Sequence, residues 1–107
     1  MRFLLIVSVP TDHADAVRKA LSEAGAGKLG NYDSCSFSSR GTGRFRPLEG
    51  AHPAIGSVGR LEEIEEERIE AMVDVSSEGA LKSVIAAVRK AHPYEEPAIH
   101  VAPMIEV

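Results

Sequence analysis

The sequence predicts a single α+β domain with the ferredoxin-like order β-α-β-β-α-β, a four-stranded antiparallel sheet with both helices on one face. Two segments, 14–24 and 81–91, carry apolar residues at helical spacing. Four other segments are continuous apolar runs or alternate between apolar and polar residues, as strands do. The 107 residues are 44% hydrophobic and 26% charged, a composition typical of globular proteins, and we expect one domain over residues 1–107.

The first predicted element is a strand over residues 3–9, a continuous run of β-branched residues and leucine that Pro10 ends. Such a run is typical of a strand buried on both faces. Thr11 follows in a position to cap a helix, with acidic residues in its first turn. Gly25 supplies the stop of that helix, whose apolar stripe consists of Ala14, Val17, Leu21 and Ala24.

The glycine-rich stretch that follows contains the second predicted strand. We expect this strand over residues 32–37, followed by a bulge or tight turn at the Gly-Thr-Gly of residues 41–43. Phe45 then resumes the extended direction before a proline ends it. Residues 48–59 are predicted to form a loop, because they contain Pro53, Gly56 and Gly59.

Residues 60–75 fit two patterns. Leu61, Ile64 and Met72 recur at helical spacing, and glutamate favours a helix. In the second half of the stretch, however, apolar residues alternate with Arg68, Glu70 and other intervening side chains, which is the period of a strand. The two interpretations are nearly balanced. The alternation favours a strand that pairs with the region 32–47.

A second helix and a last strand complete the predicted domain. Ser77 is in a position to cap the helix, and the dipeptide His92-Pro93 stops it. Residues 97–107 alternate weakly and contain two prolines, as edge strands do. Both helices would cover one face of the sheet, which leaves the other face for a partner. The apolar stripe of the second helix consists of Leu81, Val84, Ile85, Val88 and Ala91.

The charge distribution and the single cysteine exclude several classes of partner. The net charge is −4, and residues 62–67 hold five glutamates, so we expect a solvated strand face there and no nucleic acid partner. Cys35 is the one cysteine and cannot form an internal disulfide, which fits a reducing compartment. The apolar start of the chain ends at Pro10, far short of a membrane span. We therefore expect a cytoplasmic protein without a membrane partner.

Two motifs suggest enzymatic or nucleotide chemistry and fail on their context. Residues 25–30 match the glycine pattern of dinucleotide-binding loops, but they follow a helix and precede a strand, the reverse of what such a site needs. Cys35 could pair with His92 or His100 as a nucleophile, yet no residue near it in the sequence activates it. We predict that the chain is not an enzyme.

The densest polar cluster outside the glutamate run is His92-Pro93-Tyr94-Glu95-Glu96-Pro97. A histidine and two carboxylates can bind a divalent metal or transfer protons. Adjacent glutamates in an extended segment point to opposite faces, however, so both would not bind one ion. The favoured interpretation is a stiff connector in which Tyr94 packs and one glutamate pairs with Arg68.

The whole set of motifs resembles the middle domain of the YqfO proteins, which belong to the Ngg-interacting-factor-three family. This resemblance covers nearly the entire chain. The motifs that carry it are Gly27 to Phe37, Gly41 to Pro47, Pro53 to Gly56, Gly59 to Glu62, Glu67 to Glu70 and His92 to Glu96.

The resemblance implies a fold similar to the PII and CutA proteins, and it supports a strand over residues 60–75. In larger family members this domain is an insert between two halves that carry a two-metal site. We expect this chain to lack those halves and therefore their chemistry. The resemblance also implies self-association as a dimer or trimer, with a small ligand or protein partner bound in clefts between subunits.

We therefore predict a non-catalytic oligomeric binding or assembly module without a resident cofactor, and a regulatory role is one option for it. Its expected ligand site consists of Asn31, Tyr32, Cys35, Arg68, Glu70, His92, Tyr94 and Glu95. The alternative is a divalent-metal protein of the CutA kind, which would use thiolate, imidazole and carboxylate ligands to prefer copper or zinc. The ligands of that alternative are Cys35, His92 and Glu95.

Overall fold

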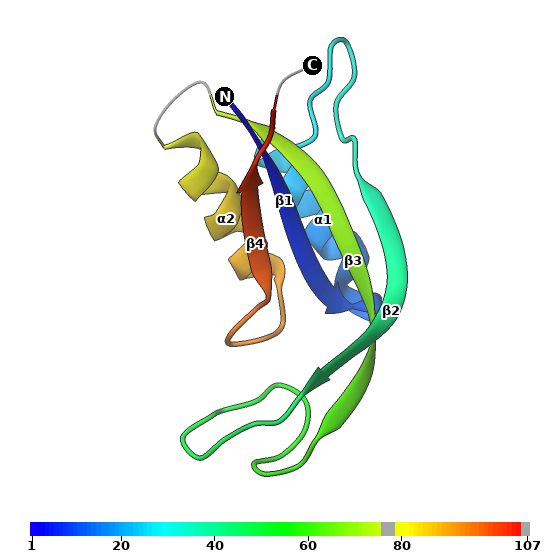
Figure 1. The fold of residues 1–107 in the computed structure, drawn as a ribbon, viewed down its shortest axis with the longest axis vertical. Helices are drawn as coiled ribbons and strands as arrows, with labels where there is room; N and C mark the ends of the chain where they lie inside the picture. The colour runs from blue at the N-terminus through cyan, green and yellow to red at the C-terminus, as the bar shows by residue number, and fades with distance from the viewer. Residues whose placement is uncertain (76–78, 106–107) are drawn as a thin grey trace.

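The structure is a computed structural model that describes residues 1–75 and 79–105. A four-stranded antiparallel sheet in the order β2-β3-β1-β4 has two helices packed behind one of its faces (Figure 1). This is the ferredoxin-like arrangement that the sequence predicts. The elements are β1 (Arg2–Pro10), a short 3-10 turn (Thr11–His13), α1 (Ala14–Glu23), β2 (Phe37–Phe45), β3 (Glu62–Asp74), α2 (Ala80–Ala91) and β4 (Ile99–Pro103).

The ambiguous stretch is an extended strand, as the alternation of its second half indicates. One edge of β3 pairs with β1, from Arg2 opposite Asp74 to Pro10 opposite Glu66. Its other edge pairs with β2 along the whole length of that strand. The pairing with β1 ends at Glu66, but β3 itself extends to Glu62 and remains paired with β2 there. The β2–β3 pair therefore projects beyond the rest of the sheet, at the bottom of Figure 1.

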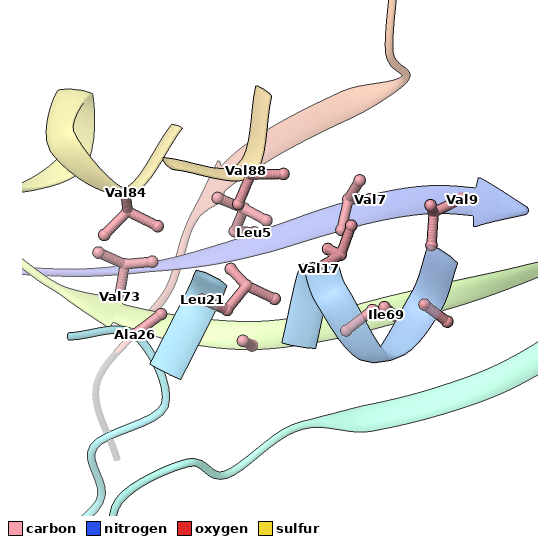
Figure 2. Packing of buried hydrophobic residues seen from close by; sticks show 12 residues of the cluster. Leu5, Val7, Val9, Val17, Leu21, Ala26, Ile69, Val73, Val84 and Val88 are labelled. Carbon is pink, nitrogen blue, oxygen red and sulfur yellow. The ribbon is translucent and has the colours of Figure 1, made fainter. Parts of the chain in front are cut away.

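The core lies between the sheet and the two helices (Figure 2). Alternate residues of β1 and β3 point towards the helices, and in β1 these are Leu5, Val7 and Val9, each 0% exposed. The predicted burial of this first strand on both faces is wrong. Leu4 and Ile6 are half-buried because no helix or strand of residues 1–75 and 79–105 covers the opposite face of the sheet.

The second strand begins later than predicted. Residues 32–36 are not a strand, since Leu29 and Tyr32 bond each other's backbone in a local turn. The Cys35 N–H donates to the carbonyl of Gly27, 2.9 Å away, and the Gly27 N–H donates in turn to Met72 O at 2.7 Å. These bonds use the backbone groups that a strand would have offered to β3.

The Gly-Thr-Gly of residues 41–43 is a regular part of β2 and not the predicted bulge or turn. Gly41 pairs with Glu66, and Gly43 pairs with Ile64. Glycine suits the second position for a steric reason, because a Cβ on Gly43 would overlap the Glu66 carboxylate. Gly43 therefore reflects close packing within a strand, whereas Gly41 has open space beside it.

The helix ends follow the prediction in part. Gly25 has a φ of 97° and ends the first helical segment as expected, and α2 stops at the extended residue His92. Thr11 does not cap a helix, because its hydroxyl donates to the carbonyl of Glu65 at 3.4 Å. The predicted cap at Ser77 lies outside the described residues.

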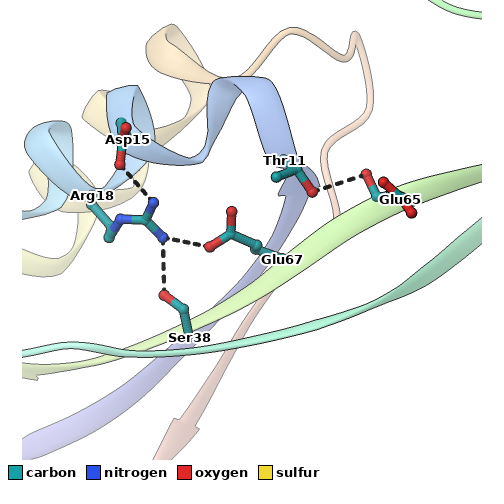
Figure 3. Close-up of polar contacts among 6 residues, drawn as sticks. All are labelled: Thr11, Asp15, Arg18, Ser38, Glu65 and Glu67. Carbon is teal, nitrogen blue, oxygen red and sulfur yellow. Dashed lines mark hydrogen bonds and ion pairs between the residues drawn. The ribbon is translucent and has the colours of Figure 1, made fainter.

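One residue of the glutamate run is not solvated. Glu67 points towards the helices and is 8% exposed, whereas Glu63 and Glu65 are exposed. The Arg18 guanidinium donates to Glu67 at 2.8 Å, to Ser38 at 3.0 Å and to Asp15 at 2.7 Å (Figure 3). Hydrogen bonds to these acidic neighbours raise the pKa of Arg18. The network ties α1 to β2 and β3.

Candidate functional site

A pocket of about 500 Å³ lies at the end of the sheet where β2 and β3 project beyond β1. We call it the distal pocket. Residues 43–48, at the end of β2 and just after it, form one side of the pocket, and four residues of the loop 51–55 form another. Four residues of the segment 94–98, before β4, complete the lining together with Ser8 of β1 and Glu66 of β3. Most of these residues are apolar, as in small-molecule sites.

Tyr94 and Glu66 supply the main polar contact of the distal pocket. The Tyr94 hydroxyl donates to Glu66 Oε2 at 3.1 Å. Burial, followed by the nearby Glu66 carboxylate, raises the pKa of Tyr94 well above its usual range, so the hydroxyl keeps its proton. The ring of Phe45 meets the Tyr94 ring edge-on, with centroids 5.5 Å apart. An aromatic wall thus stands beside a carboxylate.

His92 holds the connector against the sheet. Its Nδ1 accepts from the Tyr94 N–H at 3.1 Å, so Nε2 carries the ring proton and donates to Ser8 O at 2.7 Å. The side chain is 6% exposed, and burial lowers its pKa, with the Ser8 carbonyl and Glu66 opposing that shift. The neutral imidazole is therefore satisfied at both nitrogens, and it is a positioning residue for Tyr94.

The connector interpretation of residues 92–97 is confirmed in its main feature and wrong in one detail. Tyr94 packs as expected. Arg68 instead pairs with Glu70 at 3.3 Å, because the two residues share one face of β3. Glu95 Oε1 accepts the His52 N–H at 2.8 Å, which fastens the long loop to the connector.

The expected ligand site does not form one cluster. Of its members, Tyr94 and Glu95 line the distal pocket, and His92 lies just behind Tyr94. Cys35 lines a separate hollow beside α1, and Asn31 and Tyr32 line a third, shallow one. The remaining two, Arg68 and Glu70, lie on the face of the sheet that points away from both helices. We call this the helix-free face.

The three predicted metal ligands do not converge within one chain. Cys35 is anchored near Met72 through Gly27, whereas His92 is bonded to Ser8, at the other end of the sheet. Over residues 1–75 and 79–105, no three His, Cys, Asp or Glu side chains are grouped closely enough to hold a metal ion. The misplaced residue is Cys35, because its segment is a turn and not the predicted strand.

Several pocket residues were absent from the predicted site. Glu66 belongs to the glutamate run that was predicted to be a solvated strand face. Phe45 was predicted only as part of an extended segment, and residues 51–55 only as part of a loop. The useful signal was the alternation of β3, which places Glu66 on the face opposite Glu67. Its significance depends on the loop folding over it, which periodicity does not reveal.

Comparison with known proteins identifies relatives over nearly the whole chain. No family model matches the sequence. A GTP cyclohydrolase 1 type 2 homolog from Halalkalibacterium halodurans is 51% identical over 102 residues, which are 95% of this chain and 27% of that protein. The chain thus spans about a quarter of the length of the curated relatives it matches.

Solved structures agree with this relationship. A Bacillus cereus protein related to NIF3 is 47% identical, has a TM-score of 0.82, and matches 98% of this chain over 26% of its own. The periplasmic divalent cation tolerance protein CutA from Archaeoglobus fulgidus matches 100% of this chain over 87% of its own, with a TM-score of 0.68. At 17% identity, that match shows the CutA-like fold alone.

None of the described helices is both long and apolar enough to span a bilayer. The sequence relationship, the sheet order and the agreement with the NIF3-related structure all concern nearly the whole of this chain. This chain is therefore homologous to a CutA-like domain that occupies about a quarter of the GTP cyclohydrolase 1 type 2 homologs, the NIF3-related family.

Proposed function

We propose that this domain is a non-catalytic assembly and binding module. It associates with copies of itself through the helix-free face of the sheet, and it accepts a small ligand in the distal pocket. The observation that carries the proposal is that one face of a four-stranded sheet has no covering element among the described residues. Cys35, a free thiol, suits a reducing compartment and supports a cytoplasmic location.

The helix-free face has an apolar centre. Leu4, Ile6 and Met72 are half-buried there, and Phe37 is 68% exposed. Phe37 is paired with Glu70, which lies opposite Ile6, so the three side chains form one row across the sheet. An exposed aromatic residue beside half-buried aliphatic ones is typical of a surface that a partner covers.

A second copy of the chain is the partner that this face fits. Glu70, the middle residue of this row, forms an ion pair of 3.3 Å with Arg68, so the face carries both charge signs. In a symmetric dimer the same surface of each copy contacts the other. A surface that carries both positive and negative side chains can then pair the positive groups of one copy with the negative groups of the other. A face of one sign would repel its own copy.

The polar groups in the pocket and directly behind it suit binding more than proton transfer. Both His92 nitrogens are engaged, and its lowered pKa favours the neutral ring. The raised pKa of Tyr94 keeps its hydroxyl protonated far above neutral pH. A general acid or base works best with a pKa near the working pH. These features support a ligand-binding role.

Replacing Phe37 with aspartate should dissociate the assembly while leaving the fold intact. The side chain contributes apolar area to the contact but little to the monomer core, since it is 68% exposed. A buried charge without a partner would weaken association by about tenfold or more. Sedimentation equilibrium should show an oligomer for the wild-type chain and mostly monomer for Phe37→Asp.

The matched control is Leu61→Asp, because Leu61 is 62% exposed but lies in the loop before β3. This variant should sediment as the wild-type chain does. A wild-type chain that remains monomeric at every concentration, or an equal loss of association in both variants, would contradict the proposed interface.

A further inference from the structure

The carboxylate of Glu66 has one oxygen that the protein leaves available. Oε2 accepts the Tyr94 hydroxyl at 3.1 Å. Among the described residues, no donor is bonded to Oε1, and this oxygen is not sealed from solvent. An anionic oxygen at the edge of a mostly apolar pocket is best satisfied by a cationic or hydrogen-bond-donating ligand group.

The strand next to Glu66 is shaped to leave this carboxylate in place. Gly43 lies beside it on β2, and any side chain there would overlap the carboxylate. On the other side the Tyr94 hydroxyl fixes its orientation. The aromatic pair of Phe45 and Tyr94 adds ring surface to the wall, and ring faces attract positively charged groups.

The remaining charges of the pocket favour a cation as well. Three lining residues are acidic, Glu66, Glu95 and Glu96, and two are basic, Arg44 and Arg46. Arg44 is already paired with Glu63 at 3.0 Å. The lining therefore has an excess of negative charge, in a chain whose net charge is −4.

We propose that the distal pocket binds a small molecule with a flat apolar body and a positively charged nitrogen. The nitrogen donates to Glu66 Oε1, and the apolar body packs between the Phe45–Tyr94 wall and the loop 51–55. This assignment rests on the ligand-binding role proposed above and does not depend on self-association.

The test uses three probes of nearly equal shape, 2-phenylethylamine, 2-phenylethanol and phenylacetate, in titrations followed by amide NMR. The amine should give saturable shifts at residues 43–55 and 94–98, and the alcohol and the acid should bind about tenfold more weakly or not at all. Glu66→Gln keeps an acceptor for the Tyr94 hydroxyl but removes the charge. That variant should bind the amine about tenfold more weakly.

Glu65→Gln is the matched control, since Glu65 is exposed and points to the other face of β3. It should bind the amine as the wild-type chain does, and both variants should unfold at nearly the wild-type temperature. Equal binding of the amine and phenylacetate, or an unchanged affinity in Glu66→Gln, would overturn the ligand class. The absence of saturable shifts with all three probes would overturn the binding role of the pocket. Self-association is tested separately, by the mass that sedimentation equilibrium gives.

Discussion

Replacing Leu5 with alanine should lower the free energy of unfolding by about 2–5 kcal/mol, the usual cost of a large-to-small change in a closed core. Leu5 is 0% exposed and belongs to the cluster between the sheet and both helices (Figure 2). Its removal leaves a cavity that Val84 and Val88 on α2 cannot fill without moving. Urea denaturation at low protein concentration measures this loss.

The adjacent residue is the control. Leu4 points to the helix-free face and is half-buried, so Leu4→Ala should lower the unfolding free energy of the monomer by less than about 1.5 kcal/mol. It should weaken self-association instead. Equal destabilisation by the two substitutions would contradict the sidedness of β1 on which the whole arrangement depends.

Replacing His92 with alanine should cost about 2–4 kcal/mol, because it removes two buried hydrogen bonds and leaves a cavity. The imidazole joins the end of α2 to Ser8 on β1 and also accepts from the Tyr94 N–H. Without it the connector should detach from the sheet. Thermal and urea unfolding measure the loss, and the exposed His100, changed to alanine, should give a near-wild-type value.

This histidine also gives stability a pH dependence of known sign. Burial lowers the pKa of His92 below the ordinary value of a histidine, so the unfolded chain takes up a proton that the folded chain resists. Its contribution is complete above the unfolded pKa and is lost as the pH falls below it. Between about pH 7 and pH 5, wild-type stability should decline more steeply than that of His92→Ala. Parallel curves for the two proteins would contradict the neutral, buried ring.

The sequence predicts the architecture well where one periodicity dominates. The apolar stripes of α1 and α2 each form one face, and the structure buries or half-buries those residues. For residues 60–75 the helical and strand periods were nearly balanced, the alternation of the second half favoured a strand, and the family resemblance supported that choice. The prediction was weaker at residues 32–36, since a turn closed by backbone bonds between Leu29 and Tyr32 has no apolar pattern.

The candidate site was harder to predict because it is built from distant segments. Tyr94 and Glu95 were identified from their polar cluster, but their partners, Glu66 and the His52 backbone, lie 28 and 43 positions away along the chain. Cys35 was grouped with them only by residue type. Local patterns indicate which face a side chain takes, and they do not show which loop covers that face.

The most direct test of the account asks whether the helix-free face is covered in solution. A gadolinium chelate in the solvent relaxes methyl groups that it can approach, and the methyls of Ile6 and Met72 report on this face. They should be protected in the wild-type oligomer and become accessible in Phe37→Asp, while the exposed methyls of Val58 relax equally in both. Equal relaxation of the Ile6 and Met72 methyls in the oligomer and in the monomer would contradict the proposal that a second copy covers this face.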